Sequence, residues 1–193
     1  MASFIDEFMK DYGSEVAGQL SSNLNVDKGT VSKLIPQLAP LIISGLKKQK
    51  DERGGDERVN HILNKYGDSS VLNNIKDLIA SKVSDDTTDA NLGGLLGTSG
   101  GNVAAQALSQ KLNVDSSVIQ KMIPALAPLI LGALTKKRDT SSSGIGGVGS
   151  LLDADSYGSI IDDIAGFLLK GGGSSGTKNK GIIGSLLGGI LRK

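Results

Sequence analysis

Several residue types on which protein chemistry often depends are absent or rare in this chain. Among its 193 residues there is no cysteine, no tryptophan and only one histidine, His61. Without cysteine the chain can form no disulfide, no thiolate metal site and no cysteine nucleophile. A single histidine leaves little for a histidine-based metal site or catalytic triad. Because we find no nucleophile beside a base, we expect a protein that is not an enzyme.

Aromatic side chains and an excess of one charge are also lacking. Aromatic residues make up 3% of the chain, whereas glycine occurs 27 times, so we expect an aliphatic core packed closely through small residues. Lys and Arg number 21 against 20 Asp and Glu, so no global field attracts nucleic acid or anionic lipid. The N-terminal residues carry acids among their apolar residues and no basic stretch before them. This is not a secretory signal, and we expect a cytoplasmic location.

One apolar segment occurs twice. Residues 24–46 are LNVDKGTVSKLIPQLAPLIISGL, and residues 112–134 are LNVDSSVIQKMIPALAPLILGAL. The two stretches share thirteen of twenty-three positions at a constant offset of 88 (112 minus 24). A unit of about ninety residues is far longer than the ~20–50 residues of solenoid repeats, so each copy has the size of a domain. We therefore predict tandem units at residues 1–97 and 98–193 that pack together.

The apolar pattern within each copy is helical. Ile35, Leu38 and Ile42 recur at spacings of three and four residues. Neighbouring leucines widen this apolar surface beyond that of a helix with one solvent-exposed face. Asp27 or Thr30 can cap the start of this helix in the first copy, and Asp115 can do so in the second. The sequence therefore predicts an all-α fold in which this segment of each copy is a central helix.

Two prolines, Pro36 and Pro40, lie inside the predicted central helix, and the second copy repeats the pair. Proline has no backbone N–H, so in a helix interior it costs ~3 kcal/mol and bends or breaks the helix. We expect a bend or a restart at Pro36. The apolar run of residues 34–46 falls short of the ~20 residues that span a bilayer, so we expect no transmembrane segment.

Three stretches have the composition of connections between helices. Residues 47–58 are charged, residues 135–149 are basic and then rich in serine and glycine, and residues 171–180 are rich in glycine and serine. We therefore expect charged and Gly/Ser-rich linkers between the helices of the two units.

Several motifs together resemble a known bacterial family. They are LNVD, the K-x-IP-x-LAPLI segment, a later acidic turn and a closing GSLLGG. In this combination the chain resembles the YidB-like family, a domain of unknown function, over nearly its whole length and as two tandem copies. The resemblance implies an all-helical fold and a soluble bacterial protein. It implies no activity and no site residues.

Residues 20–35 and 108–123 resemble, in their spacing, the helix-turn-helix of lac-repressor-type regulators. In that motif the first residues of the second helix lie at base edges. Lys28, Lys33 and Lys121 would then contact nucleic acid. These are few basic residues compared with the several phosphate contacts that strong binding usually involves. We favour two helices packed through a tight turn, and keep a nucleic-acid-binding module as the alternative hypothesis.

A second motif, LDADSYGSIIDDI at residues 152–164, resembles a calcium loop. Gly158 stands where the sharp turn of such a loop belongs, but Ile164 replaces the bidentate glutamate. A turn leading into a helix explains the same residues, and we favour it; no other cofactor is indicated. The candidate calcium ligands are Asp153, Asp155, Ser159, Asp162 and Asp163.

A third acidic group contains Asp85, Asp86 and Asp89. A solvated turn explains it better than a pair of carboxylates for acid and base chemistry, which needs a cleft and shifted pKa values. The sequence as a whole thus favours a non-enzymatic helical interaction or scaffold protein. We expect its partner to be another protein or a second copy of the chain.

Overall fold

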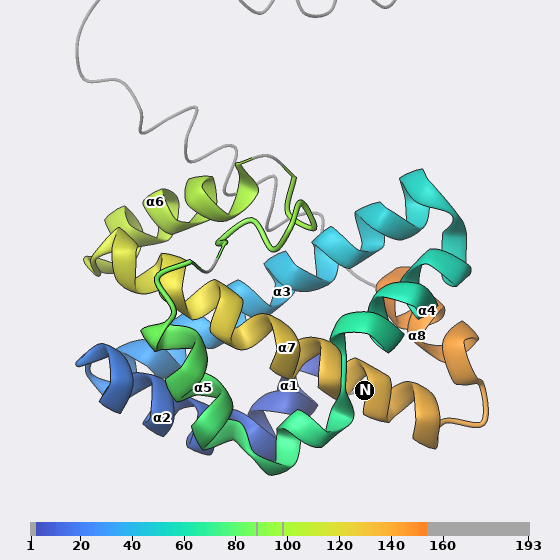
Figure 1. The fold of residues 1–193 in the computed structure, drawn as a ribbon, viewed down its shortest axis with the longest axis horizontal. Coiled ribbons are helices and arrows are strands. Elements are labelled where there is room, and N and C mark those ends of the chain that lie inside the picture. Colours follow the sequence, from blue (N-terminus) through green and yellow to red (C-terminus); the bar gives the residue numbers. More distant parts are fainter. Residues whose placement is uncertain (1–2, 88, 98, 154–193) are drawn as a thin grey trace, which may run out of the picture.

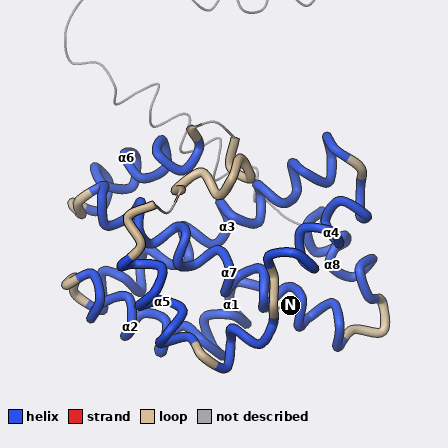
Figure 2. The backbone as a smooth tube through the Cα atoms, viewed as in Figure 1, coloured by secondary structure: helices blue, strands red, loops and turns tan. Residues whose placement is uncertain are grey.

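A computed structural model describes residues 3–87, 89–97 and 99–153, and every regular element in these residues is helical (Figures 1 and 2). The predicted all-α fold is therefore confirmed for this part of the chain. In chain order the elements are α1 (Phe4–Phe8), the π-helical turn η1 (Met9–Gly13), α2 (Ser14–Leu24), α3 (Lys28–Arg53), α4 (Gly55–Tyr66), the 3-10 turn η2 (Ser69–Asn73), α5 (Ile75–Ser84), α6 (Gly100–Leu112), α7 (Ser116–Thr140) and α8 (Gly144–Asp153).

The turns before the two long helices α3 and α7 have the same geometry. Asn25 and Asn113 close the preceding helices in the left-handed conformation, with φ of 53° and 52°. Asparagine tolerates this conformation better than most residues. Asp27 then accepts a hydrogen bond from the Thr30 backbone N–H at 2.9 Å, and Asp115 accepts one from the Ser117 N–H at 2.8 Å. Both predicted aspartate caps are confirmed.

The cap at Asp115 predicts a dependence of stability on pH. The Ser117 backbone N–H, followed by its hydroxyl, lowers the pKa of Asp115 below its ordinary value of 3.8. Because the folded state has the lower pKa, the stabilisation is present above pH 3.8 and is lost as the pH falls through the folded pKa. The variant Asp115→Asn keeps an acceptor oxygen that cannot titrate. Urea denaturation should show a smaller loss of stability for Asp115→Asn than for wild type between about pH 5 and pH 3; equal losses would contradict the assignment.

Both long helices run without interruption through their prolines. Helix α3 contains Pro36 and Pro40, and helix α7 contains Pro124 and Pro128. The expected restart at Pro36 is therefore wrong, and the alternative, a bend at Pro36, stays a prediction. A proline removes only its own backbone hydrogen bond, and the burial of the apolar residues around it holds the rest of the helix together.

The expected linkers are also corrected. Residues 47–53 belong to α3, and α4 follows after Gly54 alone. Helix α3 is extended by ion pairs one turn apart, Lys47–Asp51 at 2.9 Å and Lys48–Glu52 at 4.0 Å. Residues 135–140 continue α7, and α8 begins at Gly144. Residues 171–180 lie outside the described residues.

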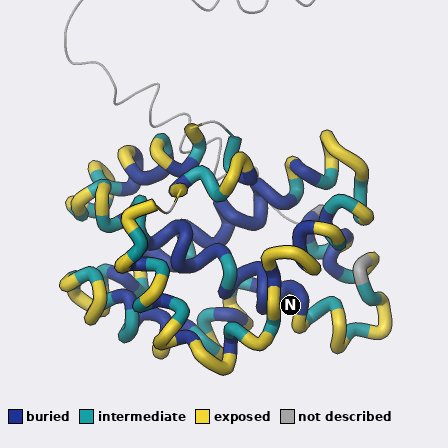
Figure 3. The backbone as a smooth tube through the Cα atoms, in the orientation of Figure 1, coloured by how far each residue is buried: buried dark blue, intermediate teal, exposed yellow. Residues whose placement is uncertain are grey.

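Helices α3 and α7 pack against each other at the centre of the molecule (Figure 1). Figure 3 shows their middle turns as buried, and the side chains of Leu38 and Leu126 are 0% exposed. Elements from the first half of the chain, namely α4, η2 and α5, cover α7, while α8 contacts α3. The two halves therefore share one hydrophobic core. Their division at residues 97 and 98 stays a prediction.

Small residues allow these elements to approach closely. A Cβ placed on Gly67, at the end of α4, would lie 2.6 Å from the Thr135 hydroxyl oxygen and 2.8 Å from the Leu131 carbonyl oxygen of α7. A Cβ on Gly132 of α7 would lie 2.9 Å from the Asp68 carbonyl oxygen, just before η2. Glycine is therefore needed on both sides of the contact between the two halves.

By length and composition, α7 is the one helix in the described residues that could cross a membrane. The expectation of no such segment counted only the uninterrupted apolar run, whereas the helix is 25 residues long. However, 78% of its most apolar 18-residue window is buried inside the fold. A central helix of a core needs the same apolar composition, which makes the membrane evidence weak.

Candidate functional site: an interhelical pocket

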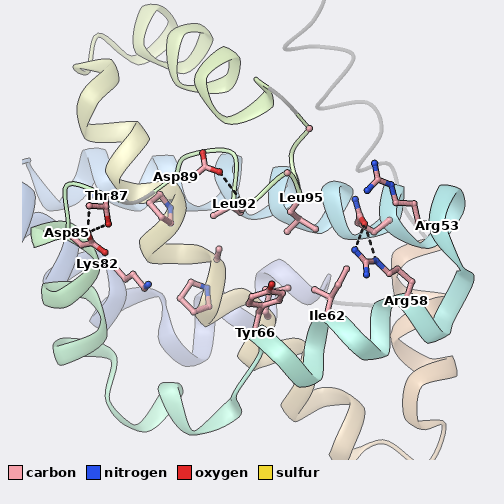
Figure 4. Close-up of a pocket in the computed structure, with 18 residues that line it drawn as sticks. Arg53, Arg58, Ile62, Tyr66, Lys82, Asp85, Thr87, Asp89, Leu92 and Leu95 are labelled. Atoms are coloured by element: carbon pink, nitrogen blue, oxygen red, sulfur yellow. Dashed lines mark hydrogen bonds between the residues drawn. The ribbon is translucent and has the colours of Figure 1, made fainter.

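A pocket of about 690 Å³ lies between α3, α4, α7 and the chain that follows α5 (Figure 4). This volume is in the range of ~300–1,000 Å³ that is typical of small-molecule sites. Its wall combines elements from both halves of the chain. The lining residues are Gln49, Arg53, Arg58, Ile62, Tyr66, Lys82, Asp85, Thr87, Asp89, Leu92, Gly93, Gly94, Leu95, Gly97, Pro124, Ala127, Pro128 and Leu131.

The apolar part of the wall comes largely from α7. Pro124, Ala127, Pro128 and Leu131 recur at spacings of three and four residues, so they lie on one face of this helix. Ile62 of α4 adds to this surface. The doubled proline motif thus supplies part of the pocket wall in α7 as well as part of the core.

One end of the pocket contains two arginines and a buried amide. Gln49 is only 6% exposed, and its Oε1 accepts hydrogen bonds from Nε and Nη2 of Arg58, each at 3.2 Å. Its amide nitrogen has no hydrogen-bond partner within the described part of the chain. Arg53 is exposed in the last turn of α3. Neither arginine pairs with a carboxylate of the described residues, so this end of the pocket is cationic and rich in donors.

At the other end, Lys82, Asp85 and Thr87 gather where α5 ends (Figure 4). The Asp85 carboxylate accepts hydrogen bonds from the Thr87 hydroxyl at 2.6 Å and from its backbone N–H at 2.9 Å. These bonds, the hydroxyl first, lower the pKa of Asp85, and the charge of Lys82 acts in the same direction. Asp85 is therefore an anion at neutral pH.

The rest of the acidic cluster shapes the turn beside the pocket. Asp89 accepts hydrogen bonds from the backbone N–H of Asn91 at 2.8 Å and of Gly93 at 2.9 Å. Asp86 forms an ion pair with Lys121 at 3.3 Å. These bonds support the interpretation of this cluster as a structural turn.

The lysines of the nucleic-acid hypothesis lie at the starts of α3 and α7. Nζ of Lys28 is 3.4 Å from the Ser14 hydroxyl, and Lys33 is exposed. Lys121 is engaged by Asp86 and by the Val83 carbonyl oxygen at 3.4 Å. Because Lys121 is paired with an acid, fewer lysines are available to contact phosphates. The nucleic-acid hypothesis stays a prediction.

The candidate calcium loop falls almost wholly outside the described residues. Asp153 is the last residue of α8. Asp155, Ser159, Asp162 and Asp163 lie beyond residue 153, so the site stays a prediction. Within the described residues no group of three or more His, Cys, Asp or Glu side chains is placed to hold a metal ion.

The pocket was missed by the sequence analysis. Arg53 and Arg58 belong to a stretch that was interpreted as a charged linker, and Gln49 was not singled out. No local signal in the sequence distinguishes Gln49, because α3 contains a second glutamine, Gln37, within its apolar run.

The fold and the pocket define a class, an all-α protein with an open interhelical pocket where its two halves meet. The chain belongs to the family described as "Bacterial protein of unknown function (DUF937)", whose model matches residues 6–137. This single match crosses from the first predicted unit into the second. No curated protein matches the chain, and no solved structure does.

Proposed function

We propose that this chain is a non-enzymatic interaction or scaffold protein that holds a partner in the interhelical pocket. The observation that carries the proposal is the pocket itself, with an apolar face from α7 and charged groups at its ends. An apolar surface with a few polar groups that fix orientation is typical of binding sites. The aspartates beside it are engaged in the structure of the turn, which leaves the arginines, Lys82 and Gln49 as the groups available to a partner.

The same proposal includes a tandem organisation of two related units. The caps of α3 and α7, Asp27 and Asp115, are separated by the offset of 88 that the sequence repeat has. Helix α8 contacts α3 in the first half, as α4 contacts α7 in the second. These correspondences, together with the resemblance to the YidB-like family, support two related units that pack against each other. A pocket at the contact between units is a common place for a binding site.

Filling the pocket tests the proposed function. The variant Ala127→Leu adds bulk to the pocket face of α7, where Ala127 is 5% exposed. Ala80→Leu is the control, because Ala80 is partly buried in α5 and does not line the pocket. In affinity capture from the native cell, proteins enriched by wild type and by Ala80→Leu should be lost with Ala127→Leu. Denaturation curves must show that both variants fold.

The contradictory result is a captured set that is the same for all three proteins. The pocket would then not be the place where this chain holds a partner, whatever the partner is.

A further inference from the structure

The arginine end of the pocket has unused hydrogen-bonding capacity. Gln49 is nine-tenths buried, and its amide nitrogen, without a partner in the described residues, belongs to a side chain of the pocket wall. This nitrogen is not among the buried side-chain atoms that lack a hydrogen-bond partner, so it is accessible and can donate to a ligand or to water. The Gln49 amide nitrogen can only donate, which means that the group it meets must be an acceptor.

Two guanidinium groups specify the charge of that acceptor. Arg58 is held against Gln49 by two hydrogen bonds of 3.2 Å and has further N–H donors. Arg53 lines the same end of the pocket (Figure 4). Planar guanidinium groups match the geometry of a carboxylate or phosphate oxygen pair. The apolar wall beside them favours an anion carried on an aliphatic group, and in an unmodified polypeptide that anion is the carboxylate of Asp or Glu.

Gly93, Gly94 and Gly97 form an open side of the pocket. Apart from their chain neighbours, no atom of the described residues lies within 4 Å of the place where a Cβ on any of them would stand. Their positive φ values, 61°, 88° and 78°, explain why the turn needs glycine. The same lack of side chains lets a ligand backbone approach this wall closely.

We propose that the pocket binds a segment of a protein partner in which an aspartate or glutamate, held by Gln49, Arg53 and Arg58, adjoins aliphatic side chains that lie on the α7 face. Figure 4 shows charged groups at both ends of the pocket with Ile62, Tyr66 and Leu95 between them. A polypeptide provides spaced polar and apolar groups of this kind, together with a backbone that can lie along the glycines. This inference rests on the proposed function and names the chemistry of the partner.

The test is selection of a displayed library of random linear peptides on the full chain. Enriched peptides should contain an aspartate or glutamate next to Leu, Ile or Val. Changing that acid to its amide should weaken binding at least about tenfold in fluorescence anisotropy, because hydrogen bonds to charged groups are among the stronger ones.

Variants of the protein locate the acid. Gln49→Glu keeps the size of the side chain and its bonds to Arg58, but its carboxylate should repel an acidic peptide and weaken binding at least about tenfold. Arg53→Met should weaken binding several-fold. Lys48→Met removes the same charge from the same helix away from the pocket and should leave binding unchanged.

Three results would overturn the inference. They are enrichment of peptides with no preference for acids, binding that Gln49→Glu does not weaken, and binding of decanoate in the pocket with no enrichment of peptides. The capture experiment with Ala127→Leu distinguishes failure of the acidic-peptide inference from failure of the proposed function. A pocket-dependent partner without an acidic segment would overturn only the inference.

Discussion

Leu38→Ala and Leu126→Ala should each lower the free energy of unfolding by ~2–5 kcal/mol. This is the usual cost of truncating a core leucine, because the substitution removes buried apolar atoms and leaves a cavity. Both side chains are 0% exposed, one in α3 and one in α7. Urea denaturation of the two variants measures the effect. Similar losses are expected because the two helices share one core.

Lys33→Ala is the matched control for these variants. Lys33 is exposed on α3 and should change stability by less than about 0.5 kcal/mol, as surface substitutions usually do. If Leu38→Ala or Leu126→Ala had an effect as small as this control, the corresponding helix would not be central.

Gly67→Ala should destabilise the protein by about 1–3 kcal/mol, the usual effect of overpacking a well-packed contact. The added methyl group would lie 2.6 Å from the Thr135 hydroxyl oxygen and 2.8 Å from the carbonyl oxygens of Leu131 and Leu63. Two of these atoms belong to backbone that cannot move independently. Helix α7 must therefore shift away from the end of α4, which opens the contact between the two halves.

Gly146→Ala is the control for this substitution. Gly146 is exposed in α8, and apart from its chain neighbours and the backbone of its own helix no atom of the described residues lies within 4 Å of the place where its Cβ would stand. Alanine in a helix is favoured over glycine by roughly 0.5–1 kcal/mol, so this variant should be neutral or slightly more stable in the same denaturation experiment. A neutral Gly67→Ala would contradict the close approach of α4 and α7.

Much of the fold could be predicted from local patterns. The cap at Asp27 and the apolar spacing of Leu38 and its neighbours depend on residues within a few positions of one another. The failure at Pro36 has a different cause. Proline is unfavourable in an isolated helix, but here contacts from distant elements stabilise α3, and no local pattern contains those contacts.

The pocket could not be predicted in the same way, because its parts are distant in the chain. Gln49 and Pro128 belong to different halves and meet only through the packing of α3, α4 and α7. The charged residues 47–58 indicated a linker by composition, yet ion pairs one turn apart make part of this stretch helical. Composition alone does not distinguish a charged helix from a charged connection.

Native-state hydrogen exchange in increasing denaturant tests most directly whether the two halves form one body. Helices α3 and α7 lie in different halves, but they pack against each other and contribute to the same hydrophobic core. Their most protected amides, those of the turns around Leu38 and Leu126, should converge on one opening free energy that equals the global free energy of unfolding. Separate opening of α7 at a lower free energy, with α3 still protected, would contradict the shared core and the pocket between the halves.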